Sequence, residues 1–200
     1  IAVTSTYDSS NELVNRLFRN VLNSQTSNFF YLPTDCPQRN ERMGWTGDAQ
    51  VFSSAASYNA DVYNLYRNWL RTFRDCQFKD GSLPVFAPTY EPNYDTIPPG
   101  FSGISWDAAL MIIPYNLYQQ TGNPAIIRDN MEAIERYLDY LAASPLVIPD
   151  SEDDLDSGTV VPELTGQVGF LADWLSIDDT PPGLINEAVY VYLLGISAEM

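Results

Sequence analysis

The sequence contains no histidine, two cysteines and a single lysine among its 200 residues. Without histidine, this chain cannot supply a Ser-His-Asp or Cys-His catalytic group. The absence also argues against a zinc site, because neither cysteine belongs to a C-x-x-C pair. Cys36 and Cys76 themselves leave two interpretations open, which are a single disulfide or two buried thiols that pack as small hydrophobic side chains.

Long hydrophobic runs and C-terminal positive charge are also scarce. No apolar run approaches the roughly 20 residues of a membrane-spanning helix, and no charged-then-apolar export signal opens the chain. Residues 81–200 hold eighteen acidic side chains against only Arg128 and Arg136, and the whole chain has a net charge of −16. Such a surface repels nucleic acid and anionic membranes and favours a neutral substrate. The acidic composition and scarce lysine favour an extracellular location, although the compartment stays open.

The remaining composition, 45% hydrophobic, is typical of a globular protein with a core. Apolar residues recur at helical spacing in five stretches, and no convincing strand pair is visible. Short turns and long loops alternate between the helices, which predicts an all-α fold of the α/α toroid type. The predicted helices are 11–25 with Ser9 or Ser10 as N-cap, 48–75 with a break near Asn59, 106–120, 124–143 and 182–200.

Two segments between these helices are expected to be loops. Residues 80–104 are rich in proline, glycine and aromatic side chains, and loops of this length in a compact domain tend to be functional. Residues 150–158, DSEDDLDSG, are acidic and lack the ligand spacing of an EF-hand, so a solvated surface loop is the simpler interpretation.

The segment DCPQRNERMGWTGDAQ, residues 35–50, follows neither a helical nor a strand period. Its composition suits glycoside hydrolysis, in which one carboxylic acid protonates the leaving oxygen and a second carboxylate activates water or attacks the sugar. Charged side chains bind hydroxyl groups, and an indole ring offers an apolar surface to the sugar. A salt-bridged loop without catalytic function is the alternative. The residues concerned are Asp35, Arg39, Glu41, Arg42, Trp45 and Asp48.

This segment, extended upstream as NFFYLPTDCPQRNERMGWTGDAQ, resembles the signature of family 78 glycoside hydrolases, the inverting α-L-rhamnosidases. It departs from the usual form only at Asn40, where Asp is common, and at Met43, where Leu is common. The stretches SSNELVNRLFRNVLNSQTSNF, DGSLPVFAP, GISWDAALMIIPYNLYQQTGN and LADWLSIDDTPPGLINEAVYVYLLGISAEM are similar to further blocks of the family in the same order. The resemblance implies an (α/α)6 barrel, in agreement with the helix pattern.

The resemblance also implies a role for each matching residue. Glu41 would be the general acid, and Trp45 would form a wall of the sugar subsite. Trp106 and Trp174 fall where the family has further aromatic walls, although either could be a core aromatic, and Asp107 could simply cap a helix. Rhamnose hydroxyls would be bound by Asp35, Arg39 and Asp48.

The family's catalytic base, a glutamate, and a sugar-binding histidine would lie beyond the point that matches Met200. We therefore expect residues 1–200 to be the N-terminal portion, about half, of a catalytic barrel truncated at its C-terminus. Its partners would be a rhamnose-containing glycoside or polysaccharide, the rest of the barrel and flanking β-domains, with no cofactor and no metal. The implied activity is release of terminal α-L-rhamnose with inversion; an α/α-barrel hydrolase of another sugar and a non-catalytic sugar-binding barrel remain alternatives.

Overall fold

The computed structural model describes residues 1–89, 103–143, 177–178, 180 and 182–200. Within these residues the chain is mostly helical, and none of the helices is long and apolar enough to cross a membrane. The elements are β1 Ala2–Val3, α1 Glu12–Asn28, α2 Thr46–Asn59, β2 Ala60–Asp61, α3 Tyr63–Asp75, α4 Ile104–Asp107, α5 Ala109–Thr121, α6 Ala125–Arg128, α7 Met131–Ala143 and α9 Pro182–Ser197.

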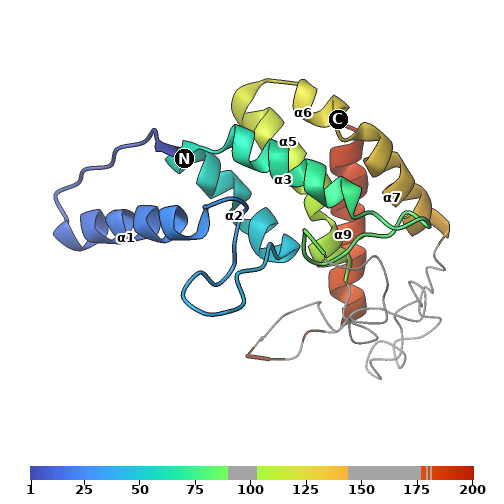
Figure 1. Cartoon of the computed structure of the whole chain (residues 1–200), viewed down its shortest axis with the longest axis horizontal. Helices are drawn as coiled ribbons and strands as arrows, with labels where there is room; N and C mark the ends of the chain where they lie inside the picture. The colour runs from blue at the N-terminus through green and yellow to red at the C-terminus, as the bar shows by residue number, and fades with distance from the viewer. Residues whose placement is uncertain (90–102, 144–176, 179, 181) are drawn as a thin grey trace.

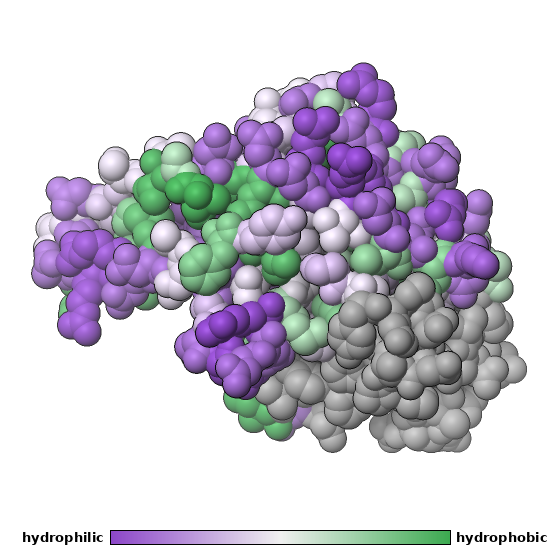
Figure 2. Space-filling model, in the orientation of Figure 1, coloured by the Kyte–Doolittle hydropathy of each residue, from purple (hydrophilic) through white to green (hydrophobic). Residues whose placement is uncertain are grey.

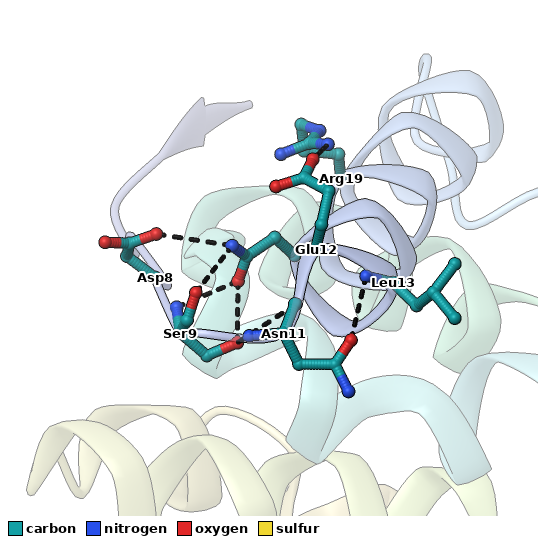
Figure 3. A network of polar contacts seen from close by, with 7 residues as sticks. Asp8, Ser9, Asn11, Glu12, Leu13 and Arg19 are labelled. Atoms are coloured by element: carbon teal, nitrogen blue, oxygen red, sulfur yellow. Dashed lines mark hydrogen bonds and ion pairs between the residues drawn. The ribbon is translucent and has the colours of Figure 1, made fainter.

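The first helix begins later than predicted. Asn11 is its N-cap, because the Asn11 side chain accepts a hydrogen bond from the Leu13 N–H at 3.0 Å (Figure 3). Neither Ser9 nor Ser10 caps the helix, so that prediction is wrong. The Ser9 hydroxyl instead donates to the side-chain oxygen of Asn15 at 2.9 Å, which helps to fix the entry of the chain into α1.

The apolar stripe of α1 faces solvent over its N-terminal half. Figure 1 shows α1 extending from the side of the molecule, away from α5 and α9. Leu13 and Leu17 are 74% and 61% exposed, whereas the buried residues of α1 are Asn15 and Gln25. The Gln25 amide is buried because it donates to the Ala56 carbonyl at 3.1 Å, near the end of α2. Leu13, Val14 and Leu17 are therefore left exposed by the described residues, while the rest of the stripe, Phe18, Val21 and Leu22, is partly buried.

The predicted break near Asn59 is confirmed. Helix α2 ends at Asn59, and Ala60–Asp61 forms strand β2 before α3 begins at Tyr63. Strand β2 pairs antiparallel with β1, with Ala2 opposite Asp61 and Val3 opposite Ala60. A pair of two-residue strands is too short to produce a hydrophobic period, which explains why periodicity did not reveal it.

The core lies where α5 packs against α2, α3 and α9. The predicted helix 106–120 is divided into α4 and α5, and the predicted helix 124–143 into α6 and α7. Helix α5 ends at Gly122, whose φ of 67° is the left-handed conformation that glycine adopts at helix C-termini. The largest fully buried side chains are Tyr66, Leu70, Phe73, Leu83, Leu110, Met111, Ile113, Leu117, Ile126, Tyr137 and Leu193.

The observed helices agree with the predicted all-α hairpin pattern in order and approximate position. The final helix, predicted over 182–200, is α9, Pro182–Ser197. The acidic segment 150–158 and Trp174 lie outside the described residues, as does most of the predicted loop 80–104. Cys36 and Cys76 are both free thiols, which decides against the disulfide interpretation.

Candidate active site

Residues 35–43 form a loop that Asp35 closes through both its backbone and its side chain. The Asp35 N–H donates to the Met43 carbonyl at 3.1 Å, and the Met43 N–H donates to Asp35 Oδ1 at 3.0 Å. Within the loop, Arg42 has a φ of 51°, and its Nε donates to the Pro37 carbonyl at 3.2 Å. Oδ1 of Asp35 therefore maintains the loop conformation. The hydrogen bond from Met43 does not use Oδ2, which can accept from another partner.

Glu41 lies near the end of this loop, with a donor at each carboxylate oxygen. Trp45 Nε1 donates to Glu41 Oε1 at 2.8 Å, and the Arg39 guanidinium forms an ion pair with Glu41 Oε2. The Glu41 side chain is 26% exposed and the Arg39 side chain is 61% exposed, so this ion pair lies near the surface of the described part of the chain. A proton on Glu41 would have to replace one of these two donors.

Three carboxylates gather around this loop. Ligand atoms of Asp35, Cys36 and Glu41 lie within 4.8 Å of one another. Burial raises the pKa of Asp48, and the negative charges of Asp35 and Glu41 raise it further. The Asp35 carboxylate raises the pKa of the Cys36 thiol through a hydrogen bond, and partial desolvation adds to that effect. The site therefore disfavours the ionised forms of Asp48 and Cys36.

The spacing of Asp35, Cys36 and Glu41 is close enough to hold a cation. However, Met43 N–H already donates to Asp35, and both oxygens of Glu41 have donors. The carboxylates are thus arranged to accept hydrogen bonds, and a metal would have to displace them. This arrangement suits polar hydrogen-bonding ligands such as hydroxyl groups.

Trp45 is held by a strand-like contact with the segment after α3. Trp45 and Phe86 form an isolated antiparallel bridge, and their ring centroids lie 5.3 Å apart at 64°. The N–H and the hydroxyl of Thr46 both donate to the Val85 carbonyl at 2.9 Å. Sequence analysis did not identify Phe86 as part of the site, and its only sign was the aromatic content of the predicted loop 80–104.

Trp106 joins the same aromatic cluster from α4. Trp45, Trp106 and Met43 are partly buried and pack against Val85 and Phe86. The Trp106 indole lies directly on Gly47, at the start of α2. The structure therefore brings two of the three predicted aromatic walls to the first turn of α2, while Trp174 lies outside the described residues.

Asp107, next to Trp106, does not cap a helix. It is the last residue of α4, and its buried Oδ1 has no hydrogen-bond partner among the described residues. Burial raises the pKa of this carboxyl well above its usual value. Tyr137 of α7 is buried nearby, and the Asp107 charge adds to the burial that raises the pKa of Tyr137. Asp107 therefore belongs to the packing between helices.

A pocket of about 270 Å³ opens between the end of α1, residues 33–35 and the start of α2. This volume is just under the roughly 300–1,000 Å³ of typical small-molecule sites. Asp35 and Asp48 both contribute to its wall, with Phe29 and Phe52 as apolar surfaces. Figure 2 shows the hydrophobic surface beside α2 meeting a hydrophilic projection that corresponds to the loop 35–43. Asp35 therefore connects this pocket with the group around Glu41.

In this all-α fold, carboxylates and indole rings meet at the start of α2, an arrangement that suits a carbohydrate-binding or glycoside-hydrolysing site. The sequence model of the bacterial alpha-L-rhamnosidase 6 hairpin glycosidase domain matches residues 2–200. The chain therefore belongs to this family of glycosidases, and the predicted family and all-α barrel fold are confirmed.

Named relatives agree with this assignment. The chain is 37% identical over 201 residues to an alpha-L-rhamnosidase of Formosa agariphila, an alignment that covers 96% of this chain and 19% of the relative. It is 29% identical to an alpha-L-rhamnosidase of Streptomyces avermitilis, covering 98% of this chain and 17% of that protein. The chain thus spans about a fifth of the length of these relatives.

Solved structures show the same fold. The Streptomyces avermitilis alpha-L-rhamnosidase, crystallised with L-rhamnose, superposes with a TM-score of 0.80 at 28% identity and covers 98% of this chain and 17% of that one. The native enzyme from Aspergillus terreus gives a TM-score of 0.76 at 28% identity, with 99% and 22% coverage. The described helices thus form part of a six-hairpin glycosidase barrel.

Proposed function

We propose that this chain is the N-terminal portion of a catalytic barrel that hydrolyses terminal α-L-rhamnosides with inversion, and that Glu41 is the general acid. The observation that carries the proposal is the gathering of Asp35, Glu41 and Asp48 beside Trp45, in a chain of the alpha-L-rhamnosidase family. The names of the relatives supply the substrate, since the site itself is compatible with other neutral sugars.

In this mechanism Glu41 transfers its proton to the glycosidic oxygen as the bond to the leaving group breaks. A water molecule, activated by a carboxylate from a segment after Met200, attacks the anomeric carbon from the opposite face. Inversion places the two carboxyl groups roughly 6.5–9.5 Å apart. Asp35 and Asp48 line the pocket and would accept hydrogen bonds from sugar hydroxyls. Trp45 and Trp106, which are not part of the lining of that pocket, would cover the apolar face of the ring.

The ion pair between Arg39 and Glu41 sets a condition on this role. For Glu41 to carry a proton, the Arg39 guanidinium must move to another acceptor, such as Asp35, Asp48 or a sugar hydroxyl. Because the Arg39 side chain is 61% exposed, such a movement requires little repacking. Substrate binding would therefore both recruit Arg39 and release Glu41 for protonation.

The test is Glu41→Gln in the full-length protein that carries this chain, with Glu12→Gln as a matched control. Glu12 is an exposed acid of α1 that also pairs with an arginine, Arg19. Loss of a general acid lowers the rate by about 10²–10⁴-fold for poor leaving groups and far less for activated aryl rhamnosides. Equal activity of Glu41→Gln and Glu12→Gln on an alkyl rhamnoside would contradict the assignment. Proton NMR of the first product tests the stereochemistry, because inversion releases β-L-rhamnose.

The same ion pair favours a second candidate, a barrel that binds rhamnosides without hydrolysing them, since Glu41 already has a donor at each oxygen. Calorimetry with L-rhamnose beside an activity assay separates the two functions. Binding without turnover by the full-length protein would support the second, and a panel of aryl glycosides would reveal a hydrolase for a different sugar.

A further inference from the structure

Gly47, the second residue of α2, lies closer to Trp106 than a residue with a Cβ atom could. A Cβ on Gly47 would lie 2.5 Å from Cε2 of the indole, 2.7 Å from Nε1 and 2.8 Å from Cδ2. Real Cβ atoms do not approach other heavy atoms so closely, so the indole rests on the bare backbone of the first turn of α2. The next residue along this turn is Asp48.

A second contact fixes the segment that carries Trp106. The side-chain amide of Gln50, three residues after Gly47, donates a hydrogen bond to the carbonyl of Ser105. Gln50 is only 8% exposed, so this bond is shielded from solvent. Helix α2 therefore holds both the backbone before Trp106 and the face of its ring.

The partly buried indole also packs against a second group of side chains. Trp106 packs with Trp45 and Met43 against Val85 and Phe86, and Val85 is itself tied to α2 by the two hydrogen bonds from Thr46. Displacement of the ring from Gly47 would disturb this cluster, and the cluster contains Trp45, the donor to Glu41. The position of Trp106 is thus coupled to the surroundings of both Asp48 and Glu41.

We propose that Gly47 is a positioning residue: the absence of a side chain there sets the place of the Trp106 indole as one wall of the saccharide site. Gln50 supports that position through the backbone of Ser105. The proposal rests on the function proposed above, because it concerns the wall of the same site. Gly47 acts through Trp106 and needs no contact of its own with the sugar.

The experiment is a double-mutant cycle in the full-length protein, with Gly47→Ala, Trp106→Phe and the combination. Displacement of a substrate-contacting group by about 1 Å can cost on the order of 10²-fold. We expect Gly47→Ala to lower kcat/KM for an aryl α-L-rhamnoside by about 10–100-fold, largely through KM. The phenyl ring of Trp106→Phe is smaller and has no Nε1, so adding Gly47→Ala to it should cost less than about threefold.

Gly195→Ala is the matched control, because Gly195 is an exposed helical glycine of α9 with open space around its Cβ. Alanine should leave kcat/KM unchanged there. Near-UV circular dichroism reports the indole directly: Gly47→Ala should alter the tryptophan bands, and Gly195→Ala should not. Gln50→Glu, which replaces the donor amide by a carboxylate, should alter the same bands.

The outcomes separate this proposal from the proposed function. Equal losses from Gly47→Ala in the wild-type and Trp106→Phe backgrounds would overturn it, as would wild-type kinetics and unchanged tryptophan bands in Gly47→Ala. If the wild-type protein hydrolyses no rhamnoside, the proposed function fails, and the cycle is then measured on whichever aryl glycoside or bound sugar a panel identifies. If Gly47→Ala shows no unfolding transition, the variant has failed to fold, and Gln50→Glu then decides. A wild-type KM and wild-type tryptophan bands in Gln50→Glu would count against the proposal.

Discussion

The indole nitrogen of Trp45 donates a hydrogen bond of 2.8 Å to Glu41 Oε1 across four residues of the same segment. Trp45 immediately precedes α2 and is held by Phe86 and by the backbone contacts of Thr46. The proposed acid is therefore oriented by a side chain that is itself anchored to the next segment of the chain. This relationship makes the aromatic wall and the acid a single unit.

Trp45→Phe should separate the two roles of that unit, because phenylalanine retains an apolar ring but has no donor for Glu41. A hydrogen bond to a charged group contributes roughly 1.5–3 kcal/mol. We expect kcat/KM of the full-length enzyme to fall by at least about tenfold and the alkaline limb of its pH profile, where a general acid loses its proton, to move. Trp69→Phe is the control, because Trp69 Nε1 donates to the Ala87 carbonyl at 2.8 Å. A pH profile changed equally by both variants would contradict the role of Trp45.

Arg39→Ala tests whether the guanidinium serves the substrate or only stabilises the loop. The Arg39 side chain of the pair with Glu41 is 61% exposed, and ion pairs at the surface contribute little to stability. The unfolding midpoint should therefore change little, while KM for a rhamnoside should rise because a hydroxyl ligand is lost. Arg19→Ala, which breaks the exposed pair with Glu12, should leave both quantities unchanged. A large fall in stability with normal KM would indicate a structural role.

Asp107→Asn should change how the stability of the protein depends on pH. Burial raises the pKa of Asp107 in the folded state, so between its usual value and this raised value the folded state holds a proton that the unfolded state lacks. The contribution of Asp107 to the free energy of unfolding is therefore fully present at acidic pH. It falls as pH rises, by up to about 1.4 kcal/mol per pH unit. The Asn variant lacks this decrease.

Urea denaturation of the full-length protein between pH 4 and pH 8 measures the effect. The free energy of unfolding of Asp107→Asn should improve relative to wild type as pH increases. Asp139→Asn, an exposed position on α7, should follow the wild-type curve. Parallel curves for Asp107→Asn and wild type would show that Asp107 is ionised in the folded state.

Gly44→Ala should destabilise the protein, because a Cβ at Gly44 would lie 2.2 Å from the Ala87 carbonyl oxygen and 2.9 Å from Trp69 Nε1. The Ala87 N–H also donates to the Gly44 carbonyl at 3.0 Å, so the two backbones are held close together. Overpacking of this kind typically costs about 1–3 kcal/mol. Thermal unfolding measures it, and a midpoint equal to that of Gly195→Ala would exclude the close approach.

Much of the fold could be predicted because helical periodicity is a local property. The break at Asn59 and the turn at Gly122 follow from residues in those places. The solvent-facing stripe of α1 illustrates the limit. Periodicity shows which residues share a helix face, but it does not show whether the covering element belongs to the same 200 residues.

The candidate site could likewise be predicted only where its residues are close in sequence. Asp35, Glu41, Trp45 and Asp48 lie within fourteen residues, so a single segment already brings them together. Phe86 and the contact of Gly47 with Trp106 depend on packing between segments distant in sequence, and composition carries little information about such pairs. A salt-bridged loop was one interpretation of this segment, but the sequence could not show that Arg39 pairs with Glu41, because an arginine beside three carboxylates has several possible acceptors.

The loop closed by Asp35 and Met43 has an evolutionary consequence. The hydrogen bonds described for this loop lie within residues 35–46 or reach residues 85–87, so these bonds of the proposed proton donor and its indole come from the first ninety residues, while Trp106 adds an apolar contact. Exchange of the downstream hairpins by recombination would leave this donor intact. New acceptors for the attacking water, and with them new sugar preferences, could arise without rebuilding it.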